Sequence, residues 1–283
     1  MSVLLKGKPV ADALNQKASA LCEDLKQKGI TPVLAVIRVG EKPDDIAYEN
    51  GAVRACAKVG AEVKKITLPV DIDNAAFLAA VTEAASDDEI SGILLLRPLP
   101  KGLDEDAALE LIPAAKDLDG CSKASFAGVY TSNGEGFLPC TAQAVMEIID
   151  FYDVNCSGKR AAVLGRSLVT GKPISMLLLD KNATVTICHS RTTDAASICA
   201  ESDIIVTCTG NPRSVGKDYF REGQTVIDVG ICVNPETGKL CGNAVQEEAE
   251  EVVAAISPVP GGVGTVTSAV LALHVVQAAA RNH

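Results

Sequence analysis

The sequence lacks the cysteine and histidine spacings that hold a structural zinc ion. It has ten cysteines and three histidines, but no Cys-x-x-Cys and no His-Glu-x-x-His occurs, and these are the patterns that bring thiolates or imidazoles to one metal. We therefore expect no metal site. Ten scattered cysteines in a chain of 283 residues instead indicate small buried side chains in a reducing cytoplasm.

Positive charge is also scarce. Lysine and arginine together number 26, against 36 aspartate and glutamate residues, which gives a formal net charge of −10. A protein of this charge has no net positive field to gather phosphates. We therefore expect neither nucleic acid nor an anionic membrane surface as a partner.

No secretion signal or membrane span is apparent. The apolar start of the chain meets Lys6 and Lys8 at once, which leaves no room for a signal peptide, and we expect a cytoplasmic protein. Residues 257–280 carry no Asp, Glu, Lys or Arg over a membrane-spanning length. However, residues 258–264 are rich in glycine and proline and cannot be helical, so we expect a loop followed by a buried helix.

What the sequence does contain is a regular alternation of apolar strands and helices. With 47% hydrophobic residues the chain can bury a substantial core, and its length fits two domains. Apolar strands that alternate with helices form mainly parallel sheets covered on both faces. The predicted strands span residues 33–39, 61–68, 92–96, 160–164, 183–188, 203–208 and 225–229, and the predicted helices span 10–29, 44–59, 74–85, 104–112, 141–152, 174–179 and 266–280.

The pattern loosens between residues 113 and 139, where small and polar residues are frequent. We place a domain junction at the helix that follows. The predicted fold class is thus α/β with two domains: residues 1–140, which the C-terminal helix 265–283 is expected to rejoin, and a Rossmann-like parallel-sheet domain over residues 141–264.

One connection in the second half has the features of a phosphate-binding turn. It reads Gly165-Arg-Ser-Leu-Val-Thr-Gly-Lys-Pro173, and a strand–glycine–helix connection presents free backbone N–H groups to a phosphate. The next strand ends at His189-Ser190-Arg191, where an NAD site usually has an Asp or Glu for the ribose 2′-hydroxyl. A hydroxyl and guanidinium groups suit a 2′-phosphate better, so the pattern favours NADP.

These residues also have ordinary structural interpretations. The spacing is Gly-x5-Gly rather than Gly-x-Gly-x-x-Gly, and many α/β proteins that bind no nucleotide contain a glycine turn. Arg166 and Arg191 are equally typical of a solvated surface.

Several blocks, in the same order along the chain, resemble the methylenetetrahydrofolate dehydrogenase/cyclohydrolase family. They are Gly92-Ile-Leu followed by Pro98-Leu-Pro100, Lys116-Asp-Leu-Asp-Gly120, Phe137-Leu-Pro-Cys-Thr141, Gly165-Arg-Ser-x-x-Thr-Gly-x-Pro173, Ala183-Thr-Val-Thr with His189-Ser-Arg-Thr192, and Pro258-Val-Pro-Gly-Gly-Val-Gly264. The resemblance implies an N-terminal folate domain, a nucleotide domain, NADP as cofactor, tetrahydrofolate one-carbon derivatives as substrates, and a homodimer.

The family's two reactions share one folate site. The dehydrogenase moves a hydride from the methylene carbon of 5,10-methylenetetrahydrofolate to the nicotinamide, and the cyclohydrolase opens the methenyl product with water to give 10-formyltetrahydrofolate. The resemblance implies substrate contacts at Tyr48, Pro98, Leu99, Asp119, Pro260, Gly261 and Gly262, and cofactor contacts at Gly165, Arg166, Ser167, Gly171, Ser190, Arg191, Thr209, Gly210 and Ile231.

Tyr48 and Asp119 are the catalytic candidates. We expect Tyr48 to stack on or hydrogen-bond the folate beside the reacting carbon, and Asp119 to accept hydrogen bonds from pterin N–H groups. The plainer alternatives are a tyrosine that packs a helix and an aspartate that forms an Asp-Gly turn. Cys140 has nothing near it in sequence that would activate a nucleophile, so we expect it to pack.

The sequence departs from the family at the position of a lysine. The family's folate-site helix carries Tyr-x-x-x-Lys, whose two side chains share one helix face, but here Ala52 follows Tyr48 by four residues. Asp45 also replaces a family serine. Lys58 lies at a different helical angle and should not substitute for the missing amine.

A second departure lies at the end of the predicted strand 92–96. Leu96 replaces a family glutamine, and Arg97 stands where leucine is usual. Arg97 has two interpretations: a fixed positive charge that enters the folate site, or a surface residue beside Pro98. In neither case does it restore a proton shuttle, because a guanidinium stays charged.

These losses affect the two reactions unequally. Hydride transfer requires two carbons to be held about 3–3.5 Å apart, and it leaves a cation that a nearby ammonium would not help. Hydrolysis needs an activated water, and removing a general acid–base typically costs about 10²–10⁴-fold. We therefore predict a dehydrogenase whose cyclohydrolase activity is lost or greatly weakened. The alternatives are the full bifunctional enzyme and a non-catalytic folate- or nucleotide-binding protein.

Overall fold

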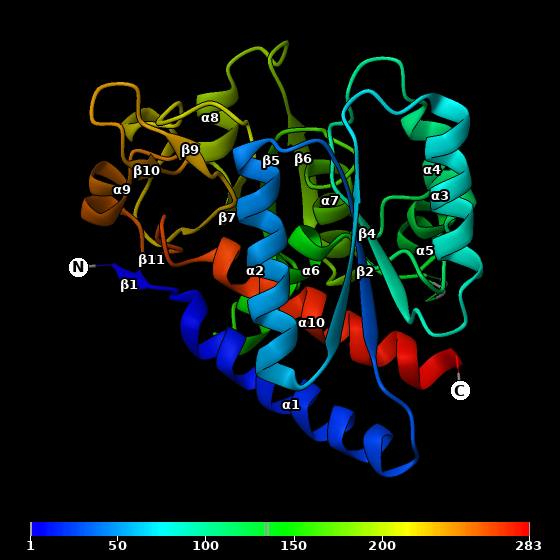
Figure 1. Cartoon of the computed structure of the whole chain (residues 1–283). Helices are drawn as coiled ribbons and strands as arrows, with labels where there is room; N and C mark the ends of the chain where they lie inside the picture. Colours follow the sequence, from blue (N-terminus) through cyan, green and yellow to red (C-terminus); the bar gives the residue numbers. More distant parts are fainter. Residues whose placement is uncertain (1, 133, 135, 283) are drawn as a thin grey trace. The chain divides into compact units, whose positions relative to one another are not determined.

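A computed structural model of the chain describes residues 2–132, 134 and 136–282 (Figure 1). The chain divides into two compact units, each of which is described by itself. The six-stranded unit comprises Met1–Ala11 and Thr141–Thr267, and the three-stranded unit comprises Asp12–Cys140 and Ser268–His283. Two helices contribute residues to both units, namely α1 (Gly7–Gln27) and α10 (Val263–Asn282).

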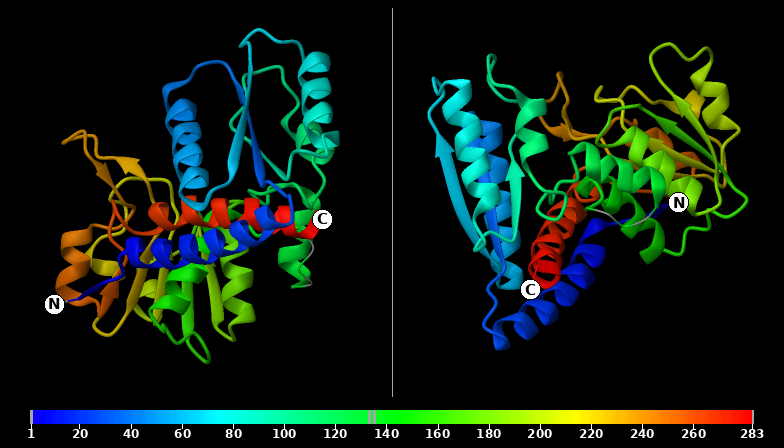
Figure 2. Two further views of the ribbon diagram at one scale, coloured as in Figure 1. Left: turned by 60° about the horizontal axis from the view of Figure 1, so that its bottom comes forward. Right: turned by 90° about the vertical axis from the view of Figure 1, so that its right-hand side faces the viewer.

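The three-stranded unit is built on a parallel sheet in the order β3-β2-β4. Its strands are β2 (Val33–Val39), β3 (Glu62–Leu68) and β4 (Gly92–Leu95), and its own helices are α2 (Pro43–Val59), α3 (Asn74–Ser86), α4 (Glu105–Leu111) and α5 (Lys123–Thr131). Apart from Arg38 the central strand is apolar, and it is buried on both faces, as a covered parallel strand requires. Figures 1 and 2 show α2 and α3 on opposite sides of this sheet, which is what right-handed crossovers in opposite directions produce.

Helix α2 presents Tyr48, and both of its ends are fixed by sequence. Pro43 occupies the first turn with Asp44 and Asp45, and Gly60 ends the helix in the left-handed conformation at φ 84°, where glycine is favoured. Along its length, buried residues recur every three or four positions. The helix therefore has one face against the sheet and leaves the Tyr48 side partly open.

The six-stranded unit contains a parallel sheet in the order β1-β11-β8-β7-β5-β6. Its strands are β1 (Val3–Leu4), β5 (Arg160–Leu164), β6 (Thr184–Cys188), β7 (Ile204–Thr207), β8 (Thr225–Asp228) and β11 (Ala255–Ile256). A separate antiparallel ribbon is formed by β9 (Cys232–Val233) and β10 (Leu240–Cys241). The helices of this unit are α6 (Cys140–Phe151), α7 (Gly171–Asp180), α8 (Ala195–Ala200), η1 (Lys217–Tyr219) and α9 (Gln246–Val252). The chain leaves β5 toward β6 through α7 and returns past β5 to β7 through α8. The strand order thus reverses at the β5–β7 pair, which is the topological switch point where ligands bind in such sheets.

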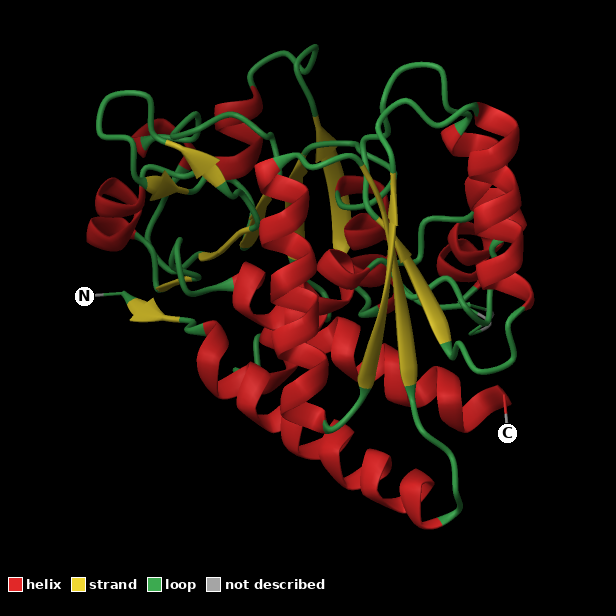
Figure 3. Ribbon diagram, in the orientation of Figure 1, coloured by secondary structure: helices red, strands yellow, loops and turns green. Residues whose placement is uncertain are grey.

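The predicted α/β class with a parallel sheet and a C-terminal helix is confirmed. Figure 3 shows how helices and strands alternate in both parts of the chain. The C-terminal helix α10 is long and apolar enough to cross a membrane, but most of it is buried inside the protein, as in the core helix of a globular fold.

The structure differs from the sequence prediction in several places. Helix α10 begins at Val263, inside the segment 258–264 for which the sequence predicts a loop. Residues 2–11 pack with the six-stranded unit instead of the N-terminal domain, because β1 pairs with β11 through Val3↔Ala255 and Leu4↔Ile256. The segment 113–139 is not loose throughout, because it contains α5. That helix has little apolar periodicity and begins at an N-cap, where the Ser122 side chain accepts a hydrogen bond from the Ser125 N–H.

Candidate active site

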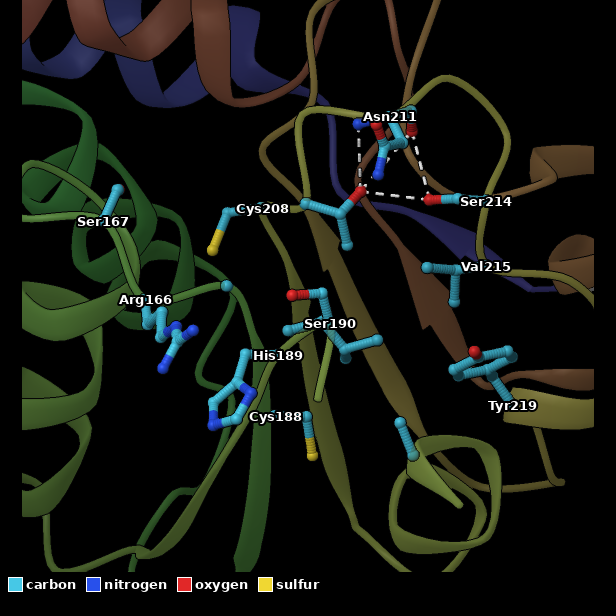
Figure 4. A pocket seen from close by; sticks show the side chains of 14 residues that line it. Arg166, Ser167, Cys188, His189, Ser190, Cys208, Asn211, Ser214, Val215 and Tyr219 are labelled. Carbon is cyan, nitrogen blue, oxygen red and sulfur yellow. Dashed lines mark hydrogen bonds between the residues drawn. The ribbon is translucent and has the colours of Figure 1, made fainter. Parts of the chain in front are cut away.

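A cavity of about 380 Å³ opens at the switch point of the six-stranded sheet. It lies at the carboxyl ends of β5, β6 and β7, and its lining includes Gly165, Arg166, Ser167, His189, Ser190 and Thr209. Figure 4 shows Arg166 and Ser167 on the turn after β5, with Val215 and Tyr219 on the opposite side of the cavity. Both apolar walls and polar groups are therefore available to an elongated ligand such as a dinucleotide.

Two glycines allow the turn after β5 to fold tightly. Gly165 has φ 139°, and a Cβ atom there would lie 2.4 Å from the carbonyl oxygen of Cys208 on the neighbouring strand. A Cβ atom on Gly171 would lie 2.2 Å from the Gly165 carbonyl oxygen. Gly171 thus acts through the close approach of α7 to the turn rather than by lining the cavity. This cradle of backbone and glycine fits a phosphate group at the helix N-terminus.

The end of β6 supplies the second polar wall. Ser190 lines the cavity beside His189, and the His189 Nδ1 accepts a hydrogen bond of 3.2 Å from the Arg191 N–H. The exposed Arg191 itself is not among the residues that line the cavity, and neither is Gly210. Of the two predicted arginines, the structure therefore places only Arg166 at the cavity.

A smaller cavity of about 190 Å³ lies in the same unit, between the loop 258–265 and the β9–β10 ribbon. It is lined by Ile231, Leu240, Pro260, Gly261 and Gly262, among others. Ile231, which the resemblance assigns to the cofactor, thus lines the same cavity as Pro260, Gly261 and Gly262, which it assigns to the substrate. A Cβ atom on Gly262 would lie 2.5 Å from the Pro258 carbonyl oxygen, so this loop also depends on glycine for its close turn.

The remaining predicted substrate residues belong to the three-stranded unit. Tyr48 lies on α2, Arg97, Pro98 and Leu99 follow β4, and Asp119 lies between α4 and α5. Tyr48 is 45% exposed as a whole residue, yet the pKa of its phenol is raised. The main cause is the loss of water around the hydroxyl, and the nearby Asp119, Cys140 and Cys121 add to it. The charge of Asp119 thus acts on Tyr48, and the phenol stays protonated.

Arg97 points into the cluster formed by Tyr48, Asp119 and Cys121. Its Nη1 pairs with Glu105 Oε1 at 3.1 Å, and its Nη2 donates to the Cys121 Sγ at 2.9 Å. Glu105 in turn accepts a hydrogen bond of 3.3 Å from the Leu99 N–H. The guanidinium is thus held in place beside Asp119, which favours the first of the two interpretations of Arg97.

Asp119 is set in an environment that opposes its charge. Burial raises the pKa of Asp119, while the Cys121 thiol at 3.4 Å and the positive charge of Arg97 act in the opposite direction. Its neighbour Asp117 has a different role, because its Oδ2 accepts hydrogen bonds from the Ser122 N–H and the Ser125 hydroxyl, both at 2.7 Å. Asp117 therefore fixes the start of α5.

Cys140 lies behind this cluster and packs, as the sequence predicts. Its thiol is fully buried and donates to the Leu118 carbonyl oxygen at 3.2 Å. The same oxygen accepts a hydrogen bond of 2.8 Å from the His274 Nδ1–H. Burial raises the pKa of the Cys140 thiol well above its ordinary value, so it remains protonated and inert.

The position of the missing lysine is a closed, apolar one. Ala52 is 3% exposed and Leu96 is 6% exposed, so neither presents a polar group to the cluster. One turn of α2 away, the buried Glu49 pairs with Arg38 at 3.0 Å and with Lys65 at 2.8 Å. Burial alone would raise the pKa of Glu49, but the hydrogen bonds from Lys65 and Arg38 hold it below its ordinary value. These two ion pairs anchor α2 to the sheet and thereby fix the position of Tyr48, which lies on the same helix.

Three residues of the cluster are absent from the sequence prediction. Glu105 and Cys121 hold Arg97, and Lys42 donates from its Nζ to the Pro98 carbonyl oxygen at 3.0 Å. Their positions in sequence carry little signal, since Glu105 simply begins a helix. Only Lys42 could have been noticed, because it immediately precedes the Pro43 that begins the Tyr48 helix. Among the residues that the structure describes, no group of three or more His, Cys, Asp or Glu could hold a metal ion.

A doubly wound parallel sheet, with a glycine turn and a cavity at its switch point, defines the class of this chain as a dinucleotide-binding α/β protein. The model of the tetrahydrofolate dehydrogenase/cyclohydrolase NAD(P)-binding domain matches residues 139–283, and the model of the catalytic domain of the same family matches residues 5–119. The chain belongs to the tetrahydrofolate dehydrogenase/cyclohydrolase family. The resemblance inferred from the sequence blocks is thereby confirmed.

Individual relatives match over their whole length. The bifunctional protein FolD of Carboxydothermus hydrogenoformans is 47% identical over 279 residues, which are 98% of this chain and 97% of the relative. The bifunctional protein FolD of Alkaliphilus oremlandii is 47% identical over 283 residues, which are 100% of this chain and 99% of the relative.

Solved structures agree with these relatives. The bifunctional FolD enzyme of Campylobacter jejuni superposes with a TM-score of 0.97 at 33% identity, over 100% of both chains. The Trypanosoma brucei methylenetetrahydrofolate dehydrogenase-cyclohydrolase, solved with NADP cofactor and inhibitor, superposes with a TM-score of 0.93 at 32% identity, over 99% of this chain and 98% of the other.

Proposed function

We propose that this chain is an NADP-dependent 5,10-methylenetetrahydrofolate dehydrogenase in which the cyclohydrolase activity is lost or greatly weakened. Family membership and full-length similarity to FolD enzymes support the dehydrogenase. The loss of the cyclohydrolase activity is inferred from one observation. Ala52, four residues after Tyr48 on α2, is buried and offers only a methyl group where the family has a lysine.

The cavity at β5, β6 and β7 is the proposed NADP site. The glycine cradle at Gly165 and Gly171 suits the pyrophosphate, and Arg166 with the Ser190 hydroxyl suits a 2′-phosphate. The cofactor, when bound, supplies the nicotinamide that accepts the hydride. We assign its neighbourhood to Ile231 and the loop with Pro260, where backbone groups line the smaller cavity.

The cluster in the three-stranded unit is the proposed site for the pterin. The Asp119 carboxylate accepts hydrogen bonds from the pterin N–H groups, and binding such donors offsets the cost of its buried charge. Tyr48 stacks on the ring or donates from its protonated hydroxyl. Arg97 keeps a fixed positive charge beside Asp119 and restrains the loop with Pro98 and Leu99.

This arrangement supports hydride transfer better than hydrolysis. The first reaction needs two bound carbons held close and aligned, which stacking and hydrogen bonds to the pterin provide. The second needs a group that moves protons to and from water. At the relevant face of α2 the chain offers the methyl group of Ala52, and Arg97 stays charged.

One residue favours the bifunctional alternative. Lys42 carries an exposed ammonium that donates to the Pro98 carbonyl oxygen at 3.0 Å, and the named relatives are bifunctional. In the bifunctional alternative, Lys42 or a water that it holds would replace the missing lysine. Lys42 therefore has to be tested directly.

The test is a parallel measurement of both initial rates on one preparation. We expect methylenetetrahydrofolate to reduce NADP, and methenyltetrahydrofolate to hydrolyse at its spontaneous rate. Ala52→Lys should raise hydrolysis toward the about 10²–10⁴-fold that a general acid–base supplies, whereas the matched Ala52→Met, which has length but no amine, should not.

Three results would contradict the proposal. Brisk hydrolysis by the wild type that Lys42→Met abolishes would establish the bifunctional alternative. Brisk hydrolysis that survives Lys42→Met would show that another group activates water. No reduction of either nicotinamide cofactor would leave a binding protein.

The proposed protein is a cytoplasmic homodimer. Burial of most of α10 argues against a membrane span at this helix, because it has the length of a span but packs inside the protein. Sedimentation equilibrium tests the dimer, and a monomer at micromolar concentration would refute it.

A further inference from the structure

The β9–β10 ribbon places two cysteines directly opposite each other. The strands are antiparallel, and the register pairs Cys232 with Cys241 and Val233 with Leu240 (Figure 1). Residues paired in this way have side chains on the same face of the ribbon, with Cα atoms about 4.5–5.5 Å apart. A disulfide bond requires a Cα separation of about 4.4–6.8 Å. The backbone thus already has the spacing of a cross-strand disulfide.

Both thiols are reduced in this structure and neither is fully buried. Seven of the other cysteines are buried, where a reagent in solution cannot reach them. Burial and then the neighbouring Cys241 raise the pKa of the Cys232 thiol, which agrees with two sulfur atoms that face each other. The ribbon therefore carries a dithiol that small molecules can reach.

The Cys232 thiol also touches the cofactor-binding segment. It donates to the Gly210 carbonyl oxygen and accepts from the Asn243 Nδ2, both at 3.6 Å. Asn243 is fully buried, accepts from the Thr209 N–H at 2.9 Å and donates to the Asn211 carbonyl oxygen at 2.9 Å. Thr209 and Asn211 both line the cavity at β5, β6 and β7. The Cys232 sulfur is thus connected to two residues that line this cavity through one intervening residue, Asn243.

The other face of the ribbon faces the smaller cavity. Leu240 lines that cavity together with Ile231, and side chains alternate between faces along a strand. The dithiol is therefore on the face away from the proposed nicotinamide neighbourhood. Formation of a bond there need not block that cavity sterically, and its effect should pass through Gly210 and Asn243.

We propose that Cys232 and Cys241 form a reversible disulfide by exchange with a low-molecular-weight disulfide, and that this bond weakens NADP binding. One thiolate attacks a sulfur of the small disulfide and releases a first small thiol, leaving a mixed disulfide. The second cysteine thiolate attacks the protein sulfur of that intermediate and releases a second small thiol. Two thiol protons leave the protein, and its two electrons reduce the small disulfide.

The effect on binding follows from the contacts that the sulfur gives up. A Cys232 sulfur bonded to Cys241 has no proton to donate to Gly210, and it turns away from Asn243. We expect the KM for NADP to rise about fivefold, the change that the loss of one weak hydrogen bond produces. This consequence depends on the proposed NADP site, whereas formation of the disulfide does not.

Peptide mapping detects the disulfide bond and needs no measurement of enzyme activity. The protein is equilibrated with oxidised and reduced glutathione at several ratios, the free thiols are alkylated, and trypsin is added. Cleavage after Lys239 and Arg221 puts Cys232 and Cys241 on different peptides. We expect a cross-linked pair of these peptides that increases with the share of oxidised glutathione and disappears with dithiothreitol.

Matched variants separate the disulfide from its effect. Cys241→Ser prevents the Cys232–Cys241 bond but keeps the Cys232 contacts, so under reducing conditions its KM for NADP should equal that of the reduced wild type, and oxidised glutathione should give no cross-linked pair of these peptides. If both thiols were fully alkylated at the highest ratio of oxidised to reduced glutathione, the proposed disulfide would be refuted. A cross-link that forms while the KM for NADP stays unchanged would overturn the effect on binding. A reduced protein without dehydrogenase activity would refute the proposed function but leave the peptide result intact.

Discussion

The Nη2 of Arg97 donates a hydrogen bond of 2.9 Å to the Cys121 Sγ, and the same thiol donates one of 3.4 Å to the Asp119 Oδ2. The three side chains thus form a short chain from the end of β4 to the predicted pterin-binding carboxylate. Because burial raises the pKa of Asp119 and the charge of Arg97 opposes that rise, Arg97 helps to keep the carboxylate ionised. Its placement explains why a charged residue is tolerated next to a buried strand.

The first prediction concerns Arg97→Met. Loss of the guanidinium removes an effect that lowers the pKa of Asp119, so that pKa should rise further. The acidic limb of kcat/KM for methylenetetrahydrofolate should move to higher pH by roughly one unit or more, the usual effect of a charge at this range. Arg97→Lys keeps the charge and should move the limb less. Identical limbs in the wild type and Arg97→Met would show that Arg97 does not act on Asp119.

The second prediction separates the two arginines of the cofactor prediction. Arg166 lines the cavity at β5, β6 and β7, and Arg191 does not. Arg166→Gln should raise the KM for NADP about 10- to 100-fold, as expected for a lost hydrogen bond to a charged group. The KM for NAD, which has no 2′-phosphate, should change little. Initial rates with both cofactors measure this.

Arg191→Gln is the matched control and should leave both KM values close to those of the wild type. The assignment would be wrong if Arg191→Gln had the larger effect. It would also be wrong if Arg166→Gln weakened both cofactors equally, because that pattern reports a contact to the shared part of the dinucleotide.

Much of the fold could be predicted because its signals are local. Apolar strands such as Val33–Val39 and the glycine that ends α2 are visible in the sequence, and the structure has both. The strands β1 and β11 could not be found in this way. Each has only two residues, and their pairing joins Val3–Leu4 to Ala255–Ile256, which are far apart in the sequence.

The site shows the same division. The motif blocks point to Asp119 and the glycine turn, whereas Tyr48 is proposed only from the family's folate-site helix, whose lysine is Ala52 here. The roles of Glu105 and Cys121 arise only in three dimensions, where they hold Arg97 across separations of 8 and 24 residues. No local pattern encodes such a contact. The exclusion of Arg191 from the cavity likewise depends on the direction of a side chain at the end of β6.

The third prediction compares two glycines that occupy opposite environments. Gly51 lies inside α2, and a Cβ atom there would meet no atom within 4 Å. Gly51→Ala should therefore stabilise the protein by about 0.5–1 kcal/mol, the cost of glycine within a helix. At Gly171 a Cβ atom would lie 2.2 Å from the Gly165 carbonyl oxygen, so Gly171→Ala should destabilise by about 1–3 kcal/mol. Urea unfolding measures both, and equal effects would show that the turn after β5 can relax.

The fourth prediction concerns His274, which is buried beside Cys140. Burial lowers the pKa of His274 to about 4, more than the hydrogen bond to Leu118 raises it, and Arg281 and Asp117 act on it in opposite directions. The ring is therefore neutral in the folded protein at pH 7, with Nδ1–H as the donor to Leu118. In the unfolded chain the same ring titrates near its ordinary pKa of about 6.5.

Because the folded pKa is the lower one, the unfolded state binds more protons in the interval between the two values. The contribution of His274 to stability is complete above pH 6.5 and is lost as the pH falls toward 4, by about 3 kcal/mol in all. His274→Asn keeps an N–H donor but cannot titrate, so its free energy of unfolding should fall less steeply over this range. The test is urea unfolding of both proteins at pH 7.0, 6.0, 5.0 and 4.5, in which other titrating groups contribute equally and cancel in the difference. If the two proteins lose stability in parallel, His274 is charged in the fold and a counter-charge must compensate for its burial.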